Sequence, residues 1–390
     1  MESVKGINVL VSGAGVAGLT TAYWLVKHGF KVTVVERAPH IRPGGQALDV
    51  RGSALEVAAR MGILDKIRKD STKLMGMSVV DSTGKETFRS TERTMTGGKL
   101  DSPDVEILRD DLCRVLLQAA GDQVKYIFND TIVALNEDET GVDVRFACAA
   151  DQRFDLVIGA DGLRSNVRRI VFGADELFIR YLGYYVATFS MPNILNLDHW
   201  EVFIQHDGIP IAACIVLEKD RDARTYVGFG SEMQIDYDYR DIGLQKRMIT
   251  ERLAHVGGEI PNILEHMQNA SDFYFDSTNQ IIMDHWSKGR VGLVGDAGYS
   301  VSPALGQGTT IAMTSAYVLA GELADHRHDL RSGLNHYESE LREYVGANQE
   351  LAYRSATEPP SALGEPTEED PDGIPDFGRA SLPFSFKDYL

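Results

Sequence analysis

The chain has 390 residues, 43% hydrophobic and 25% charged, which is typical of a globular protein with two or three domains or one large unit. Its 57 acidic and 39 basic residues give a formal net charge of −18, which disfavours nucleic acid and anionic membrane surfaces as partners. Three cysteines without a CxxC pair indicate reduced structural thiols, and no sequence motif predicts a metal site. We expect a cytoplasmic protein, because the first strand leaves no room for a signal peptide and no apolar run reaches the ~18 residues of a membrane span.

Residues 7–37 have the arrangement of a dinucleotide-binding unit. An apolar run over residues 7–11 predicts a buried strand, and a helical pattern follows the segment Gly13-Ala14-Gly15-Val16-Ala17-Gly18. Gly13 allows a tight turn, Gly15 lets the backbone approach a pyrophosphate, and Gly18 lets helix and strand pack closely. A second strand then ends at Glu36.

Four further residues of this unit are expected at the cofactor. Val16 and Ala17 begin the helix, where free backbone N–H groups and the positive end of the helix dipole face the phosphates. Glu36 is placed to accept hydrogen bonds from ribose hydroxyls, and Arg37 is expected beside the adenine or ribose. The alternatives are a glycine-rich turn in another kind of α/β protein and, for Arg37, a solvated side chain.

The chain up to residue 176 predicts further α/β structure. We expect a helix over residues 53–61, a hairpin between residues 76 and 89, and a helix that begins near residue 110. Residues 124–148 have the pattern of a β-meander packed on the dinucleotide-binding domain. A buried strand over residues 154–158 follows.

The pattern changes at about residue 177. Alternating apolar and aromatic strands, with a helix over residues 245–255, predict a second domain built on a mixed or antiparallel sheet. Two helices follow, over residues 309–325 and 332–353, and a Pro-, Gly- and acid-rich stretch predicts an extended tail. We therefore predict a cofactor domain (1–73, 103–176 and 277–320), a substrate domain (74–102 and 177–276), C-terminal helices (321–356) and a tail (357–390).

Three separated segments together resemble one family. They are the GxGxxG unit with Glu36-Arg37, the segment Asp161-Gly162-Leu163-Arg164-Ser165 with Arg168, and Gly295-Asp296 followed by Pro303 and Gly306-Gln307-Gly308. In this order they resemble the class A flavoprotein monooxygenases, the para-hydroxybenzoate hydroxylase group. The chain length and the loop Gly44-Gly45…Leu48-Asp49 are most similar to the tetracycline-inactivating FAD monooxygenases.

The resemblance implies an α/β fold: a Rossmann-like FAD-binding domain with an inserted mixed or antiparallel-sheet substrate domain and C-terminal helices. It implies an FAD-dependent monooxygenase that uses O2 and NAD(P)H, with NADPH favoured. The reaction would hydroxylate a planar aromatic or polyketide-like small molecule through a flavin C4a-hydroperoxide, in antibiotic modification or biosynthesis. Because the flavin carries the chemistry, we expect no catalytic side chain and no metal, in a monomer or homodimer.

The resemblance also assigns residues to FAD. Asp296, with Gly295, is expected on the ribitol, and the backbone of Gly306, Gln307 and Gly308 at the isoalloxazine edge. Pro303 is expected against the flavin face. Asp161, Asp49 and Arg109 are implied as further contacts, with a loop N-cap as the alternative for Asp49 and a surface ion pair for Arg109.

Other side chains are candidates for the two remaining reactants. Arg42 and Arg164 are candidates for the phosphates of NAD(P)H. The substrate candidates are aromatic residues at strand spacing, which more often form core, and one histidine: Tyr184, Tyr185, Phe189, Phe203 and His206.

Other functions use the same scaffold. A flavin-dependent halogenase is disfavoured because Trp24, Trp200 and Trp286 are isolated and the WxWxIP signature is absent. An isoprenoid-type flavin reductase would share the cofactor domain, and a non-catalytic flavoprotein would sequester a ligand. Ligand-stimulated oxidation of NAD(P)H separates an enzyme from such a binder.

Overall fold

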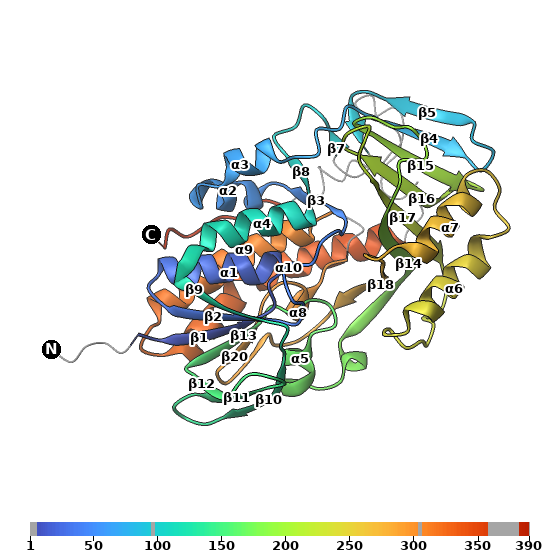
Figure 1. Ribbon diagram of the computed structural model, residues 1–390. Helices are drawn as coiled ribbons and strands as arrows, with labels where there is room; N and C mark the ends of the chain where they lie inside the picture. The colour runs from blue at the N-terminus through green and yellow to red at the C-terminus, as the bar shows by residue number, and fades with distance from the viewer. Residues whose placement is uncertain (1–5, 95–97, 303–305, 358–381, 390) are drawn as a thin grey trace.

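The computed structural model describes residues 6–94, 98–302, 306–357 and 382–389 and contains two large sheets (Figure 1). The first has six strands in the order β19-β20-β13-β1-β2-β9, and the second has seven in the order β18-β14-β17-β16-β15-β4-β5. The predicted α/β fold, with an inserted second sheet and helices toward the C-terminus, is confirmed.

The six-stranded sheet is mostly parallel, with buried central strands. β1 (Asn8–Ser12) pairs in parallel with β2 (Lys31–Glu36) on one side and β13 (Leu156–Gly159) on the other. Its residues are apolar without alternation because both faces of a parallel sheet are covered. The remaining strands are β9 (Val124–Phe128), β20 (Val291–Leu293) and the antiparallel β19 (Ser287–Lys288).

The predicted meander over residues 124–148 is wrong in its first strand. β9 pairs in parallel with β2, and only β10 (Ile132–Glu137), β11 (Val142–Phe146) and β12 (Gln152–Phe154) form the antiparallel sheet. β9 directly follows α4 (Arg109–Ala120) and its short 3-10 turn, so it returns to the parallel sheet after a helix. Strand alternation reports burial and does not identify the partner strand.

The longer helices of this part of the chain pack against one another. α1 (Val16–Lys27) packs against both α4 and α9 (Gly308–Asp325), and α10 (Leu330–Thr357) packs on α9 (Figure 1). α9 is buried over nearly its whole length, which explains why its sequence is apolar on all sides. The shorter helices are α2 (Ser53–Arg60), α3 (Leu64–Lys69), α5 (Asn166–Val171) and α8 (Asp296–Tyr299).

The seven-stranded sheet joins two distant parts of the chain. β15 (Trp200–His206) pairs in parallel with β4 (Met77–Asp81), which the hairpin partner β5 (Glu86–Ser90) flanks. The other strands are antiparallel: β14 (Ile179–Met191), β16 (Ile209–Val216), β17 (Ala223–Gly230) and β18 (Tyr274–Ile281). One face carries the predicted helix, α6 (Ile242–Leu253), and a second one that was not predicted, α7 (Ile260–Asn269).

Two small elements complete the description. β3 (Ala47–Val50) pairs with β8 (Val105–Leu108), and β6 (Arg93–Thr94) pairs with β7 (Gly98–Lys99). Residues 382–389 form neither helix nor strand. Their apolar side chains contact the larger hydrophobic core, which surrounds the six-stranded sheet. Within the described ranges, no helix has the length and apolarity needed to cross a bilayer.

Candidate active site

The glycine-rich turn between β1 and α1 is shaped by close packing. Gly13 has a φ of +106°, and a Cβ there would lie 2.5 Å from the carbonyl oxygen of Ala160. A Cβ on Gly18 would collide with the carbonyl oxygen of Gly13, whereas one on Gly15 would meet nothing within 4 Å. Two glycines therefore permit the turn, and the third leaves room for a phosphate at the N-terminus of α1.

Glu36 is fixed by backbone at the end of β2. Its carboxylate accepts hydrogen bonds from the N–H groups of Ala14 at 2.8 Å and Ala38 at 2.8 Å. Each carboxylate oxygen retains a lone pair, so Glu36 is able to accept ribose hydroxyls as well. The bond from Ala14 ties this acid to the glycine-rich turn, and the contact of Glu36 with the ribose stays a prediction. Arg37 is exposed beside it, and its cofactor contact stays a prediction.

The Gly295-Asp296 segment lies directly against the first one. Gly295 has a φ of +64°, and a Cβ there would lie 2.9 Å from the Cβ of Ala17 at the start of α1. Asp296 is exposed to solvent, yet burial raises its pKa, with Ser300 and Arg168 acting in the opposite direction. The Asp296 carboxylate is therefore reached by water while protein groups surround it, and Gly295 places it next to the start of α1.

The N-terminus of α9 borders the same region with unpaired polar groups. Gln307 caps the helix and is 1% exposed, and neither polar atom of its amide has a partner among the described residues. Buried amides are normally paired, so this one is available to a polar ligand. A Cβ on Gly308 would meet nothing within 4 Å. Pro303 lies outside the described residues.

Asp49 and Arg51 form a buried ion pair next to this helix start. Their charged atoms are 3.1 Å apart, and a Cβ on Gly306 would lie 2.7 Å from the Asp49 carboxylate. Burial raises the pKa of Asp49 to about 8, which Arg51 opposes and Glu106 reinforces. Asp49 belongs to strand β3, so the alternative that it is a loop N-cap is wrong.

Stability should depend on pH through Asp49. Its pKa is higher in the folded than in the unfolded protein, so its ionisation destabilises the fold as the pH rises. Relative to Asp49→Asn, we expect the wild-type free energy of unfolding to fall by up to about 1.4 kcal/mol per pH unit between pH 5 and pH 8. Urea unfolding of both proteins across this range measures the effect. A difference between them that does not change with pH would contradict it.

Arg109 begins α4 and reaches back to the loop after β2. Its guanidinium donates to the carbonyl oxygens of Arg42 at 2.7 Å and Gly44 at 2.6 Å. A Cβ on Gly45, where φ is +104°, would overlap the same guanidinium. Arg109 therefore braces this loop, and its contact with FAD stays a prediction.

The Asp161 segment caps a helix. The Asp161 carboxylate accepts hydrogen bonds from the Ser165 hydroxyl at 2.5 Å and from the backbone N–H groups of Asn166 at 2.9 Å and Val167 at 3.1 Å. Arg168, which is fully buried, donates to the carbonyl oxygen of Ala297 at 2.8 Å and so ties α5 to α8. The carboxylate of Asp161 therefore orders the start of α5, and its contact with FAD stays a prediction.

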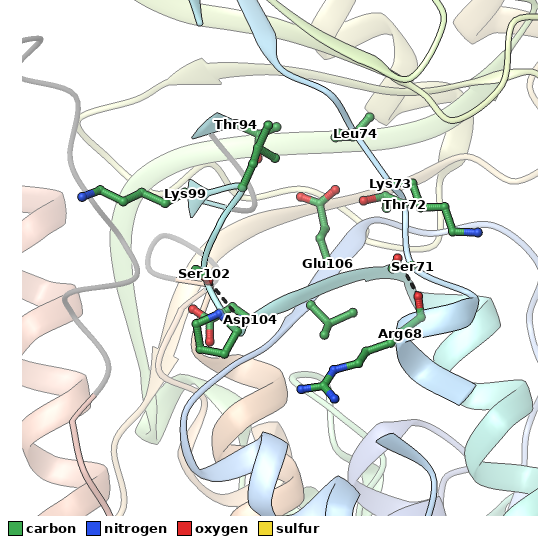
Figure 2. Close-up of a pocket in the computed structure, with 13 residues that line it drawn as sticks. Arg68, Ser71, Thr72, Lys73, Leu74, Thr94, Lys99, Ser102, Asp104 and Glu106 are labelled. Atoms are coloured by element: carbon green, nitrogen blue, oxygen red, sulfur yellow. Dashed lines mark hydrogen bonds between the residues drawn. The ribbon is translucent and has the colours of Figure 1, made fainter. Parts of the chain in front are cut away.

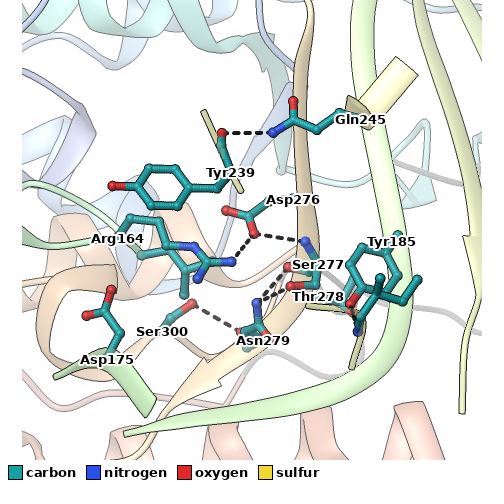
Figure 3. A network of polar contacts seen from close by, with 12 residues as sticks. Arg164, Asp175, Tyr185, Tyr239, Gln245, Asp276, Ser277, Thr278, Asn279 and Ser300 are labelled. Atoms are coloured by element: carbon teal, nitrogen blue, oxygen red, sulfur yellow. Dashed lines mark hydrogen bonds and ion pairs between the residues drawn. The ribbon is translucent and has the colours of Figure 1, made fainter. Parts of the chain in front are cut away.

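Arg164 links the two large sheets through β18 (Figure 3). Its Nη2 lies 2.8 Å from Oδ1 of Asp276, with the two side chains 26% and 11% exposed. Asp276 also accepts a hydrogen bond from the Tyr274 hydroxyl at 3.2 Å, and Arg42 lies over the Tyr274 ring, 5.0 Å from its centroid. Arg42 and Arg164, from loops that follow strands of the six-stranded sheet, thus both contact the Tyr274–Asp276 pair of β18.

The substrate candidates lie on opposite faces of the seven-stranded sheet. Tyr185 and Phe189 are 0% and 1% exposed in the core beneath α6 and α7. Tyr184 and Phe203 alternate with core residues and lie on the other face. The His206 ring packs 5.7 Å from that of His255, just beyond α6. We retain Tyr184 and Phe203 as substrate candidates, because they lie on the sheet face away from α6 and α7.

That other face meets the cofactor side of the molecule. The Tyr226 hydroxyl, on β17, accepts a hydrogen bond from the backbone N–H of Ala47 at 2.7 Å. Ala47 begins β3, the strand that carries Asp49. The sheet face with Tyr184 and Tyr226 therefore lies beside β3.

A cavity of about 400 Å³ lies beside the β3–β8 pair (Figure 2). Glu106 points into it, whereas the amines of Lys73 and Lys99 point outward. Glu106 is opposite Asp49 in the strand pair, so the cavity lies close to Asp49. The rest of the lining comes from the segments 68–74 and 99–105 and from Thr94.

Comparisons with known proteins decide the family. The family described as FAD binding domain matches residues 6–351. A flavin-dependent monooxygenase from Legionella longbeachae is 38% identical over 350 residues, which cover 89% of this chain and 88% of that protein. The chain belongs to this family of FAD-dependent monooxygenases.

Other relatives extend the comparison. The monooxygenase is 48% identical over 343 residues to the uncharacterized protein Rv1260 of Mycobacterium tuberculosis, covering 88% and 92% of the two chains. The crystal structure of tetracycline destructase Tet(51) superposes with a TM-score of 0.87 at 34% identity, covering 99% of each chain. That of Tet(55) gives 0.82 at 36% identity and 90% of each. The resemblance to tetracycline-inactivating enzymes is confirmed.

The residues of the monooxygenase fit FAD, and this cofactor prediction is confirmed by the family. Glu36 and Asp296 offer acceptors for sugar and ribityl hydroxyls, and the N-termini of α1 and α9 offer donors. The unpaired Gln307 amide suits a polar ring edge. When bound, FAD supplies the redox chemistry.

Arg51 was not predicted as the buried partner of Asp49. The signal was present, because residues two apart on an extended chain share a side.

Proposed function

We propose that this monooxygenase uses NAD(P)H and O2 to hydroxylate a planar aromatic or polyketide-like molecule held between the seven-stranded sheet and the flavin. The supporting observation is the bond from Ala47 to the Tyr226 hydroxyl, which joins the aromatic face of that sheet to the flavin-side strand. We keep a monomeric or homodimeric state and a cytoplasmic location as predictions, which gel filtration and cell fractionation test.

The residues of this face suit a flat, mostly neutral substrate. Burial raises the pKa of the Tyr184 phenol, so it stays protonated, and its hydroxyl donates to the carbonyl oxygen of Pro210 at 2.9 Å. Planar rings stack on such aromatic side chains. Glu106, which lines the cavity, is opposite Asp49 in the β3–β8 strand pair. We propose this cavity as the route by which the substrate approaches.

The proposal is tested by a screen for compounds that stimulate NAD(P)H oxidation by the purified yellow protein. The panel contains polyketides and planar aromatic compounds, and includes a tetracycline because tetracycline destructases are among the similar structures. At least one compound should accelerate oxidation and gain the mass of one oxygen atom. A ligand that binds without any stimulated oxidation or product would contradict the proposal.

Arg42 is the better candidate for a nicotinamide phosphate, because Arg164 is committed to Asp276. Arg42 is exposed beside Tyr274, and one phosphate contact at such a position contributes about 1 kcal/mol. We expect Arg42→Ala to raise KM for NAD(P)H about fivefold with little change in kcat. The matched control is Arg145→Ala, an exposed arginine on β11. Equal KM values in the two variants would exclude this role.

A further inference from the structure

The C-terminal segment, residues 382–389, lies on a surface built mainly from α9. Phe384, Phe386 and Tyr389 are partly buried against the core. The Phe384 ring contacts that of Tyr344 on α10 at 5.0 Å. The segment thus uses aromatic anchors spaced along an irregular backbone, as a bound peptide does.

A buried carboxylate supplies the polar anchor. Glu322 of α9 has a side chain that is only 3% exposed, and its Oε1 accepts from Lys387 Nζ at 2.9 Å and from the Tyr389 hydroxyl at 2.7 Å. Lys387 also pairs with Glu340 of α10 at 2.6 Å. An enclosed carboxylate is costly without such partners, so this surface favours a cation and a phenol at these positions.

Two of the aromatic anchors contact Tyr317 of α9, which also connects the segment to α1. The Tyr317 ring lies 5.4 Å from those of Phe386 and Tyr389 and 4.8 Å from that of Trp24 on α1. Its hydroxyl contacts the Lys387 carbonyl oxygen at 3.1 Å and Arg60 of α2 at 2.7 Å. One residue of α9 therefore couples the segment to α1 and α2.

Gly321 provides the space for Tyr389. A Cβ at this position would overlap the Tyr389 ring. Glycine inside a helix lowers stability relative to alanine, so its presence at the middle of the contact has a local reason.

We propose that the surface formed by Tyr317, Gly321 and Glu322 is a docking site for the chain's own residues 384–389. Docking holds α1 and α9 together, and FAD is expected to bind at the N-termini of these two helices. An undocked segment therefore weakens the retention of FAD. The FAD part rests on the cofactor site described above, whereas the docking itself does not.

The first test compares Gly321→Ala with Gly346→Ala in the full-length holoenzyme. Gly346 lies in α10, where an added Cβ meets nothing within 4 Å, so helix propensity alone favours alanine at both positions. In Gly321→Ala we expect the amide hydrogen of Tyr389, which donates to the Tyr317 hydroxyl at 3.5 Å, to exchange at least about tenfold faster, and FAD to dissociate about threefold faster. Gly346→Ala should change neither. Equal exchange in the two variants would overturn the docking site.

The second test supplies the segment in trans. A full-length variant whose own segment carries Tyr389→Ala should bind a synthetic peptide of residues 382–390 and regain slow FAD release, whereas the same peptide with Tyr389→Ala should not bind. Binding of both peptides, or of neither, would overturn the docking site. Docking without any effect on FAD release would overturn the coupling to FAD and leave the proposed monooxygenase reaction intact.

Discussion

Replacing Asp296 by alanine is expected to lower the affinity for FAD by about tenfold to a hundredfold. The carboxylate is exposed next to the start of α1, where ribityl hydroxyls are expected to donate to it. A hydrogen bond to a charged group is worth roughly 1.5–3 kcal/mol, which gives this range of affinity. The fold should survive, because the side chain is exposed and not part of a packed core.

Flavin content after dialysis and fluorescence titration with FAD measure the loss. Asp296→Asn should fall between wild type and alanine, because an amide accepts a weaker hydrogen bond than a carboxylate. Asp151→Ala, which removes an exposed acid from a turn of the first half, is the matched control. If Asp296→Ala keeps its flavin as wild type does, the ribitol lies elsewhere.

Reduction of the flavin by NAD(P)H should run at least about tenfold faster when the true substrate is bound, a barrier change of ~1.4 kcal/mol. The chain has one GxGxxG unit, which we assign to FAD, so we expect the nicotinamide donor to bind transiently. Reduced flavin that meets O2 without substrate wastes electrons as hydrogen peroxide, so reduction should wait for substrate.

Stopped-flow absorbance of the flavin measures this acceleration. The comparison requires three samples: enzyme alone, enzyme with a compound that it hydroxylates, and enzyme with a related compound that it does not hydroxylate. Only the second should be reduced rapidly. Equal reduction rates in all three samples would exclude substrate gating and would leave the monooxygenase class unaffected.

The cofactor domain could be predicted from the sequence because its signals are local. A glycine at φ of +106°, a strand with the apolar residues Val9, Leu10 and Val11 at its centre, and an acid at the end of the next strand are all signals between near neighbours in the chain. The same holds for the capping of α5 by Asp161, which involves residues at most six positions away. Family resemblance then related the distant segment at Asp296 to the first one.

Pairings between distant residues were decided only by the tertiary structure. Alternation in β14 predicts that Tyr184 and Tyr185 face opposite sides, but only the placement of α6 and α7 shows which side is core. Arg164 and Asp276, 112 positions apart, meet because β18 returns beside the first half. The tail was predicted to have no fold of its own, yet its last residues dock on α9 through Tyr317 and Glu322. Local propensity sets the conformation of a segment, whereas its partners depend on how the whole chain folds back on itself.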